Sequence, residues 1–325
     1  MSVITHQKLE EASRRLRGAI YRTPLLHSRL LNKQMKAEIF LKAENFQRTG
    51  SFKFRGAYNA ISCLDPIERS QGVVTYSSGN HAQAVARVAQ IFNIPAVVVM
   101  PNDAPPSKKS ATESYGAEVI TYERQFIQRE DIATKISIDR NMTVIPPFND
   151  ENVIAGQSTC AQEIFEDTGP LDILLVCVGG GGLISGSALA KRKLSPNCQI
   201  IGVEPFTGND VQLSLEQGKI VTIEVPNTIA DGQQTTAPGE KTFEIINDLV
   251  HSIVTVTDNE IVTAMDYLFR FQKLVIEPSG ASAMAALLSN KIDCAGKKIG
   301  LTLSGGNIDP ARFSNLMSTH TLLRL

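Results

Sequence analysis

Short aliphatic runs alternate along the chain with longer segments of helical periodicity. The runs have strand length and are rich in valine and isoleucine: 72–78, 95–101, 117–122, 172–179, 199–205 and 298–305. Segments with helical spacing lie between or beside them, at 81–92, 151–167 and 259–274. Uninterrupted aliphatic strands are typical of strands that are covered on both faces. The alternation therefore predicts an α/β doubly wound fold with mainly parallel strands.

A proline pair interrupts this alternation. The segment 146–148 reads PPF, and paired prolines end a regular element. We therefore expect two domains, with a smaller one (69–145) inserted into a larger one formed by 1–68 and 146–325.

Four of the strand-like runs end in small or polar residues. These ends are SSGN at 77–80, GGGG at 179–182, EP at 204–205 and SGGN at 304–307. In open α/β sheets, ligands bind in the crevice beyond the carboxyl ends of the strands. The four ends are therefore predicted to form one site.

Composition and charge exclude some classes of partner. The chain has 325 residues, a formal net charge of -1 and no basic block, so neither a nucleic acid nor a membrane surface is an expected partner. No apolar run reaches the roughly 18 residues that span a bilayer, and the charged N-terminal segment is unlike a signal peptide. The five cysteines are scattered and odd in number, which favours reduced thiols in a cytoplasmic protein over a disulfide framework or a metal cluster.

The glycine run at 179–182 is the strongest chemical signal. It follows an aliphatic strand and precedes a helical segment, so backbone N–H groups can converge there on an anion. Leu183 and Ile184 come next, so the run is neither a phosphate loop with a lysine nor a complete dinucleotide fingerprint. A flexible strand–helix turn is the simpler alternative, although four glycines weaken local order.

Lys53 is the candidate reagent. It lies between Phe52 and Phe54 in the segment TGSFKFRGA (49–57), an apolar setting that is unusual for a solubilising lysine. A free lysine has a pKa of about 10.4 and is a poor nucleophile at neutral pH. Packing by the two phenylalanines would make the amine of Lys53 a better nucleophile and acid/base.

Polar residues in the other motifs allow both chemical and structural roles. Ser77 or Ser78 could simply cap the following helix, and His81 could be an ordinary first-turn residue, whereas Asn80 can donate and accept beside a cofactor. Glu204 and Asp210 are hard oxygen ligands that suit Mg²⁺ or Ca²⁺. Solvated or capping carboxylates explain these two residues equally well.

Six motifs occur together in a recognisable order. They are TGSFKFRGA (49–57), SSGNHAQ (77–83), VGGGGL (178–183), GVEP (202–205), TIADG (228–232) and SGGN (304–307). Over essentially the whole chain they resemble the serine/threonine dehydratase and serine racemase family, pyridoxal-phosphate enzymes of fold type II. The resemblance implies two open doubly wound sheets, as in the tryptophan synthase β subunit, with the smaller domain closing over the substrate. Cysteine synthases of the same fold match these motifs less well.

The resemblance assigns roles to individual residues. Lys53 would bind the aldehyde of pyridoxal phosphate, and Gly179, Gly180, Gly181 and Gly182, with Leu183, would hold the phosphate. Asn80 would contact the ring hydroxyl and Ser304 the pyridine nitrogen. The loop expected to hold the substrate carboxylate consists of Ser77, Ser78, Asn80 and His81. A divalent cation (Mg²⁺, Mn²⁺ or Ca²⁺) would be bound by Glu204, Asp210 and the carbonyl of Gly208, as in the racemases of the family.

The implied reaction is β-elimination from a small β-hydroxy amino acid. L-serine or L-threonine would give a 2-oxo acid and ammonia, with the cofactor phosphate protonating the departing hydroxyl. Ser78 matches the serine that serves the family's racemases on the opposite face of the substrate, so serine racemisation is expected as a second or even main activity. threo-3-Hydroxyaspartate is an alternative substrate that needs a further cation. Arg129 can supply that cation by resemblance, although a helix-surface arginine is the simpler interpretation.

The family also implies a homodimer. Because the chain ends soon after SGGN, we expect no C-terminal regulatory domain like that of biosynthetic threonine dehydratases. Two other classes of function remain as alternatives. A nucleotide-dependent oxidoreductase would use the glycine run for pyrophosphate, and a catalytically silent binding protein would be expected to lack Lys53.

Overall fold

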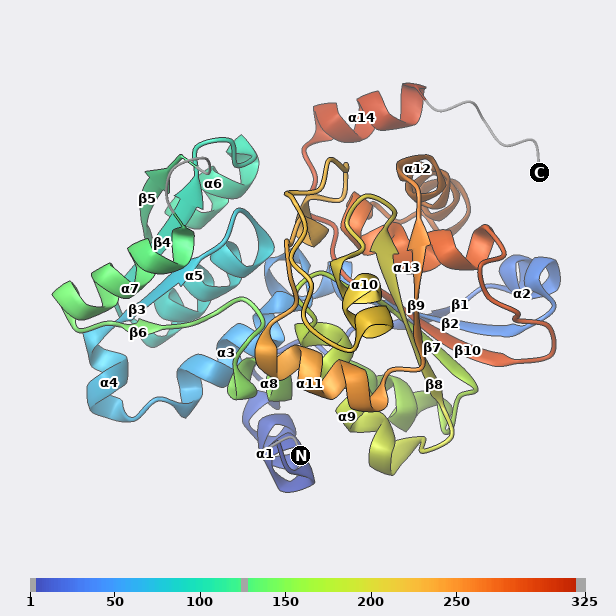
Figure 1. Cartoon of the computed structure of the whole chain (residues 1–325), viewed down its shortest axis with the longest axis horizontal. Helices are drawn as coiled ribbons and strands as arrows, with labels where there is room; N and C mark the ends of the chain where they lie inside the picture. The colour runs from blue at the N-terminus through green and yellow to red at the C-terminus, as the bar shows by residue number, and fades with distance from the viewer. Residues whose placement is uncertain (1–3, 124–127, 320–325) are drawn as a thin grey trace.

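Two mainly parallel sheets, each covered by helices, organise the chain (Figure 1). The computed structural model describes residues 4–123 and 128–319. The strand order of the larger sheet is β1 (Leu25–His27), β2 (Glu38–Ala43), β10 (Lys298–Leu303), β7 (Ile173–Cys177), β8 (Gln199–Pro205) and β9 (Ser252–Val256). Only β1 pairs antiparallel with its neighbour in this sheet. The smaller sheet is wholly parallel, in the order β5 (Glu118–Tyr122), β4 (Ala96–Pro101), β3 (Val73–Tyr76) and β6 (Thr143–Val144).

Helices connect and cover these strands. The α-helices before residue 145 are α1 (His6–Leu16), α2 (Arg29–Met35), α3 (Lys53–Cys63), α4 (Pro66–Gln71), α5 (Asn80–Phe92), α6 (Pro106–Ser114) and α7 (Arg129–Arg140). Those after it are α8 (Glu151–Thr168), α9 (Gly182–Leu194), α10 (Asp210–Gln217), α11 (Glu240–Leu249), α12 (Asp258–Tyr267), α13 (Pro278–Leu288) and α14 (Pro310–Thr319). Short 3₁₀ turns lie at η1 (Glu44–Phe46), η2 (Arg48–Gly50) and η3 (Asp231–Gln233), and a π-helical turn at η4 (Leu268–Gln272).

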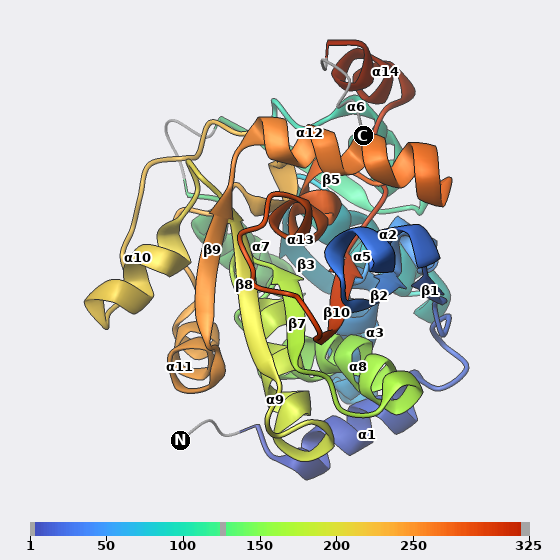
Figure 2. The ribbon, with the colours of Figure 1, turned by 90° about the vertical axis from the view of Figure 1, so that its right-hand side faces the viewer.

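Alternate residues of the central strands face opposite layers of helices, as predicted for strands buried on both sides. In β7, Ile173 and Leu175 pack in the same cluster as the buried side chains of α12 and α13. Leu174 and Val176 pack instead with those of α8 and α9. Figure 2 shows α12 and α13 on one side of the larger sheet and α8 and α9 on the other. This arrangement confirms the predicted α/β doubly wound class.

All six strands and three helices predicted from the hydrophobic pattern are present, with one change. The segment 259–274 is α-helical only to Tyr267 and then widens into η4, because Lys273 takes the left-handed conformation (φ 59°) and ends the helix. The pattern misses β1, β2, β6 and β9. β1 and β6 are very short, β9 lies at a sheet edge, and β2 contains the charged residues Glu38 and Lys42.

The smaller sheet is formed within residues 73–144, between the two parts of the chain that build the larger sheet. Its core also takes side chains from α3, where Phe54 and Ile61 pack in one cluster with Val73 and Val98. The proposed domain limits, 69 and 145, stay a prediction.

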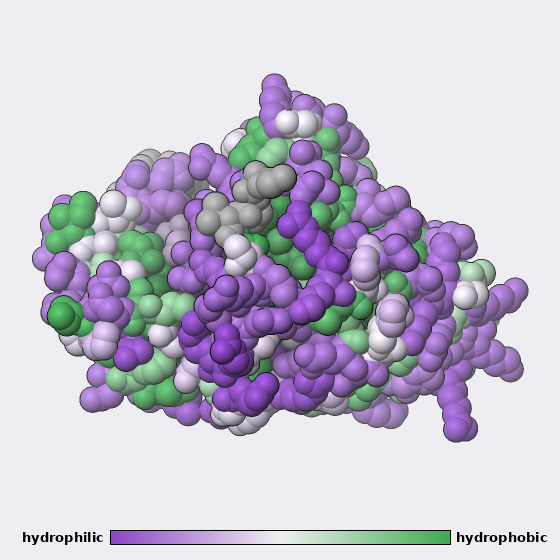
Figure 3. Space-filling view, turned by 90° about the horizontal axis from the view of Figure 1, so that it is seen from below, coloured by the Kyte–Doolittle hydropathy of each residue, from purple (hydrophilic) through white to green (hydrophobic). Residues whose placement is uncertain are grey.

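The surface agrees with the balanced composition. Hydrophilic residues cover most of the face seen from below in Figure 3, with hydrophobic residues between them in small groups. Within the described ranges, no helix is both long and apolar enough to cross a bilayer. All five cysteines are free thiols, and four of them are buried.

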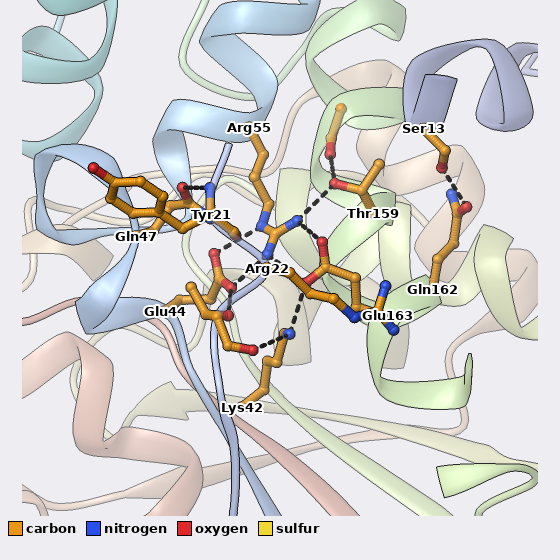
Figure 4. A network of polar contacts seen from close by, with 12 residues as sticks. Ser13, Tyr21, Arg22, Lys42, Glu44, Gln47, Arg55, Thr159, Gln162 and Glu163 are labelled. Atoms are coloured by element: carbon orange, nitrogen blue, oxygen red, sulfur yellow. Dashed lines mark hydrogen bonds and ion pairs between the residues drawn. The ribbon is translucent and has the colours of Figure 1, made fainter. Parts of the chain in front are cut away.

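A buried ionic network anchors α3, the helix that starts at Lys53 (Figure 4). The guanidinium of Arg55 donates to both carboxylate oxygens of Glu44, at 2.8 and 2.7 Å, and to those of Glu163, at 2.7 and 2.8 Å. Lys42 lies 2.6 Å from Glu163 and balances the charge, so two cations meet two carboxylates. The network thereby joins β2, η1, α3 and α8.

We predict that Arg55→Met destabilises the fold strongly, because it leaves two buried carboxylates with a single cation. Removing one partner of a buried ion pair costs about 3–5 kcal/mol, which would lower the melting temperature by roughly 5 °C. Arg22→Met is the matched control. Arg22 pairs with Glu166 and Asp167 at the surface, and such pairs contribute about 0–1 kcal/mol. Equal losses in the two variants, measured by calorimetry, would contradict this account.

Candidate active site

A pocket between the two sheets collects most of the residues that the sequence singled out. The loops after β3, β7 and β10 line it together with the start of α3. The predicted residues that line it are Lys53, Ser77, Ser78, Asn80, His81, Arg129, Gly179, Gly180, Gly181, Gly182, Leu183 and Ser304. Three of the four polar strand ends therefore meet at one place, as open α/β sheets predict.

The amine of Lys53 is partly enclosed in this pocket. Its Nζ donates to the carbonyl oxygen of Pro147 at 2.8 Å and lies 5.2 Å from the ring centroid of Phe52. Burial lowers the pKa of Lys53 to about 8, and the positive charge of Arg129 lowers it further. At pH 7 about a tenth of such an amine is neutral, against less than a thousandth of an ordinary lysine.

Phe54 does not contribute to this environment. As the second residue of α3 it points away from the pocket into the core of the smaller sheet, where its ring lies 5.9 Å from that of Tyr58. The expectation that both phenylalanines flank the amine is therefore wrong for Phe54. Successive side chains within a helix are about 100° apart, so Phe54 points to another face than Lys53, whereas Phe52 precedes the helix as its N-cap.

The glycine run forms a packed cradle. Gly181 has φ 94°, and a Cβ on Gly180 would lie 2.2 Å from the ring of Phe148, so neither position accepts a side chain. α9 begins at Gly182, and the N–H groups of its first turn have no partner within the helix. The segment is therefore fitted to bind an anion at a helix N-terminus.

Neither serine of the segment 77–80 caps the following helix, so the interpretation of Ser77 or Ser78 as a helix cap is wrong. The N-cap position of α5 belongs to Gly79, and the Oγ of Ser77 accepts a hydrogen bond from the N–H of Gly79 at 3.2 Å. Both serines instead line the pocket, together with Gly79.

Asn80 is held at both ends of its amide. Its Nδ2 donates to Oε1 of Glu277 at 2.5 Å, and its Oδ1 accepts from Nδ2 of Asn307 at 2.9 Å. The second N–H of Nδ2 remains for a ligand in the pocket. The role of Glu277 as the partner of Asn80 was not predicted from the sequence.

His81 is neutral and buried. Its Nε2 lies 3.0 Å from the carbonyl oxygen of Ile145, which can only accept, so Nε2 carries the proton. Burial and the nearby charge of Lys53 lower the pKa of His81 to about 3. The burial and neutrality of His81 support a structural role over a chemical one, although the residue lines the pocket.

Three charged residues of the pocket carry no role in the sequence-based account. Lys108 donates to Asp231 at 2.6 Å and to Glu277 at 3.2 Å, and all three line the pocket. Asp231 lies within the motif TIADG, and Glu277 directly precedes Pro278 at the start of α13. No local pattern distinguishes Lys108 from Lys109, because only the fold buries one of them.

Arg129 borders the pocket at the first turn of α7. Its side chain is 27% exposed, and Nε donates to Glu130 at 2.9 Å. Its guanidinium carbon lies 5.3 Å from the ring centroid of Tyr76, another lining residue. Arg129 is thus a partly buried cation that lines the same pocket as Lys53 rather than a freely solvated side chain.

Glu204 and Asp210 lie outside the pocket, so the prediction that all four strand ends form one site is wrong for 204–205. Glu204 is buried at the end of β8 and accepts hydrogen bonds from the N–H groups of Val211 and Gln212, at 3.1 and 2.9 Å. Asp210 is also buried, and neither of its carboxylate oxygens has a partner. Burial raises the pKa of Asp210 to about 7, and burial together with Asp210 raises that of Glu204.

Similarity to known proteins identifies the family of this chain. Residues 16–305 match the family described as "Pyridoxal-phosphate dependent enzyme". The chain belongs to this family. It is 49% identical over 318 residues to L-threo-3-hydroxyaspartate ammonia-lyase of Saccharomyces cerevisiae (98% of each chain) and 48% identical over 314 residues to serine racemase of Schizosaccharomyces pombe (97% of each). The solved structure of maize serine racemase superposes with a TM-score of 0.91, at 37% identity and 96% coverage of each chain.

Family membership makes pyridoxal phosphate the cofactor, and the pocket fits it. Lys53 offers an amine of lowered pKa for the aldehyde, and the cradle at 179–182 offers free N–H groups for the phosphate. The predicted family and fold type II architecture are confirmed. The family match also favours this cofactor over the nucleotide of an oxidoreductase.

Proposed function

We propose that this chain is an ammonia-lyase that eliminates the β-hydroxyl group of a small amino acid to give a 2-oxo acid and ammonia. The observation that carries the proposal is the lowered pKa of Lys53 in a pocket shared with the glycine cradle. The named activities of the yeast relatives, an ammonia-lyase and a serine racemase, support it.

The residues of the pocket have distinct tasks in this reaction. Bound pyridoxal phosphate supplies an electron sink for the charge that develops at Cα. The neutral amine of Lys53 removes the Cα proton, and the carbonyl oxygen of Pro147 orients that amine. The loop 77–80 holds the substrate carboxylate through Ser77, Ser78 and the main-chain N–H of Asn80, while the cradle at 179–182 binds the phosphate. The side-chain amide of Asn80 faces the ring hydroxyl of the cofactor. His81, neutral and tied to the backbone, fixes the start of α5 beside the substrate.

Ser304 favours elimination over longer-lived carbanion chemistry. It lies directly after β10 and is 4% exposed at the pocket wall. In our assignment its hydroxyl faces the pyridine nitrogen, where a hydroxyl cannot hold a cation as a carboxylate would. The resulting weaker sink favours loss of the β-hydroxyl.

Two further residues set the reaction's outcome. Ser78 serves the face of Cα opposite Lys53, which gives the enzyme serine racemase activity beside elimination. Arg129 binds a second carboxylate, since its partly buried guanidinium stands at the pocket beside Tyr76. threo-3-Hydroxyaspartate is therefore the favoured substrate, with L-serine and L-threonine as poorer ones.

A substrate panel tests these assignments. L-serine, D-serine, L-threonine and the 3-hydroxyaspartate isomers are scored for oxo acid and for enantiomer with wild type, Ser78→Ala and Arg129→Met. We expect Ser78→Ala to abolish D-serine formation while sparing elimination from L-substrates. Arg129→Met should lower kcat/KM for 3-hydroxyaspartate about tenfold to a hundredfold, the value of a charged hydrogen bond. For serine the loss should be much smaller, because only the influence of Arg129 on the pKa of Lys53 is removed.

A different result of this substrate panel would contradict each assignment. Equal loss of racemisation and elimination in Ser78→Ala would contradict the role of Ser78. A uniform loss for all substrates in Arg129→Met would contradict recognition of a second carboxylate. Absence of oxo acid from every substrate with wild type would overturn the lyase assignment itself.

A divalent cation, Mg²⁺ or else Mn²⁺ or Ca²⁺, is a further part of the proposal. The unpartnered oxygens of Asp210 beside Glu204 fit a cation, which would compensate two buried carboxylates. The carbonyl of Gly208 would complete the protein ligands. No group of three or more histidine, cysteine, aspartate or glutamate side chains in the described ranges has metal-binding geometry, so water would provide the remaining ligands.

We predict that Mg²⁺ stabilises the protein at alkaline but not at acid pH. Both carboxyls have raised pKa values in the folded state, so their contribution to stability is present at acid pH and is lost as they ionise at higher pH, which for Asp210 occurs as pH rises through about 7. Mg²⁺ should therefore raise the melting temperature at pH 8 relative to a chelator, and do so little at pH 5. Asp210→Asn should remove the effect. An equal shift by Mg²⁺ in Asp210→Asn would contradict the site.

A homodimer in the cytoplasm completes the proposal. Five free thiols support a reducing compartment. The homodimer is proposed from the family resemblance.

A further inference from the structure

A chain of charged and amide groups crosses the pocket from the smaller sheet to the larger one. Lys108 lies on α6, beside the smaller sheet, and its ammonium reaches Asp231 of η3 and Glu277 at the start of α13. Glu277 accepts in turn from Asn80, whose oxygen accepts from Asn307. Five segments distant in sequence are thus linked, with the amide of Asn80 between Glu277 and Asn307.

Glycines in the backbone leave room for these linked polar groups. A Cβ on Gly305 would lie 2.1 Å from Oε1 of Glu277, so only glycine leaves room for the carboxylate beside Asn80. A Cβ on Gly79 would lie 3.0 Å from Cδ of Lys108, so the lysine stem packs directly against the loop that holds Ser78. The same side chain therefore touches the substrate loop and neutralises the carboxylates.

Lys108 is the central residue of these linked polar groups, because its ammonium balances the charge of their carboxylates. Two carboxylates share its single ammonium, and the next cation, Arg312 on α14, is 3.8 Å from Asp231. Burial raises the pKa of Glu277, while Lys108 opposes that rise. An ionised Glu277 can only accept, which holds the N–H side of Asn80 toward it; a protonated Glu277 could also donate and would release that constraint.

We propose that Lys108 is a positioning residue of the active site: it keeps Glu277 ionised, so that Glu277 orients the amide of Asn80 with an N–H toward the cofactor ring oxygen. Its stem seats the turn at Gly79 at the same time. This inference rests on the proposed placement of the cofactor ring beside Asn80, and it is independent of which amino acid is the substrate.

The test is a double-variant cycle read by cofactor affinity. Apoproteins of wild type, Lys108→Met, Glu277→Gln and the double variant are titrated with pyridoxal phosphate, and the dissociation constant is measured by fluorescence. Methionine keeps the stem against Gly79 and removes the charge. Lys109→Met, one residue along α6, is the matched control. The pH dependence of the bound cofactor's visible absorbance is recorded for each.

We expect Lys108→Met to weaken cofactor binding at least tenfold at pH 8 and to shift the absorbance titration, with Lys109→Met unchanged. Glu277→Gln should weaken binding by a similar factor, because a glutamine, like a protonated Glu277, can donate as well as accept. The double variant should bind no more weakly than either single variant, because both substitutions remove the same constraint on Asn80. A purely structural role for Lys108 predicts instead that the two single losses add in the double variant.

Three results would overturn the inference. They are wild-type affinity in Lys108→Met, a double variant whose loss is the sum of the single losses, and a Lys108→Met apoprotein that fails to fold and is not restored by Glu277→Gln. Melting temperatures of the apoproteins identify the last case. Failure of the lyase assignment appears separately, as wild type that binds the cofactor but forms no oxo acid.

Discussion

The active site depends on one buried interaction, the bridge that Arg55 makes between Glu44 and Glu163. Lys53 and Arg55 are two residues apart at the start of α3, so whatever holds the guanidinium also fixes where the amine emerges. A guanidinium bound by two carboxylates has a rigid planar geometry that a lysine could not reproduce. The charged network is desolvated, yet each charge has an opposite partner, so it specifies position at little cost in unpaired charge.

The pocket shows the same principle on a smaller scale, because its polar groups are ordered by hydrogen bonds to neighbouring residues. Pro147 orients the amine, and Glu277 and Asn307 fix both ends of the Asn80 amide. Glycines occur where a Cβ would collide, against Phe148 at Gly180 and against Glu277 at Gly305. Catalytic groups held in this way lose little freedom when the ligand binds.

Sequence patterns predicted what depends on local order. The aliphatic runs identified the inner strands, and the motifs at 77–80, 179–182 and 304–307 identified three walls of the pocket. They could not reveal partners brought in by the fold. Lys108 is indistinguishable from Lys109 in sequence, and Glu277 comes nearly two hundred residues after the asparagine that it orients. Alternation in a strand also could not show that Glu204 turns to α10 instead of the pocket.

The central claim is that the fold converts Lys53 into a reactive amine, and reductive trapping tests it most directly. Apoprotein is mixed with one equivalent of pyridoxal phosphate across a pH series, reduced with borohydride and mapped by peptide mass spectrometry. The account predicts labelling at Lys53, with a pH midpoint near the pKa of about 8 that burial imposes. Labelling spread over surface lysines, or a midpoint at Lys53 near the ordinary value of 10.5, would contradict it.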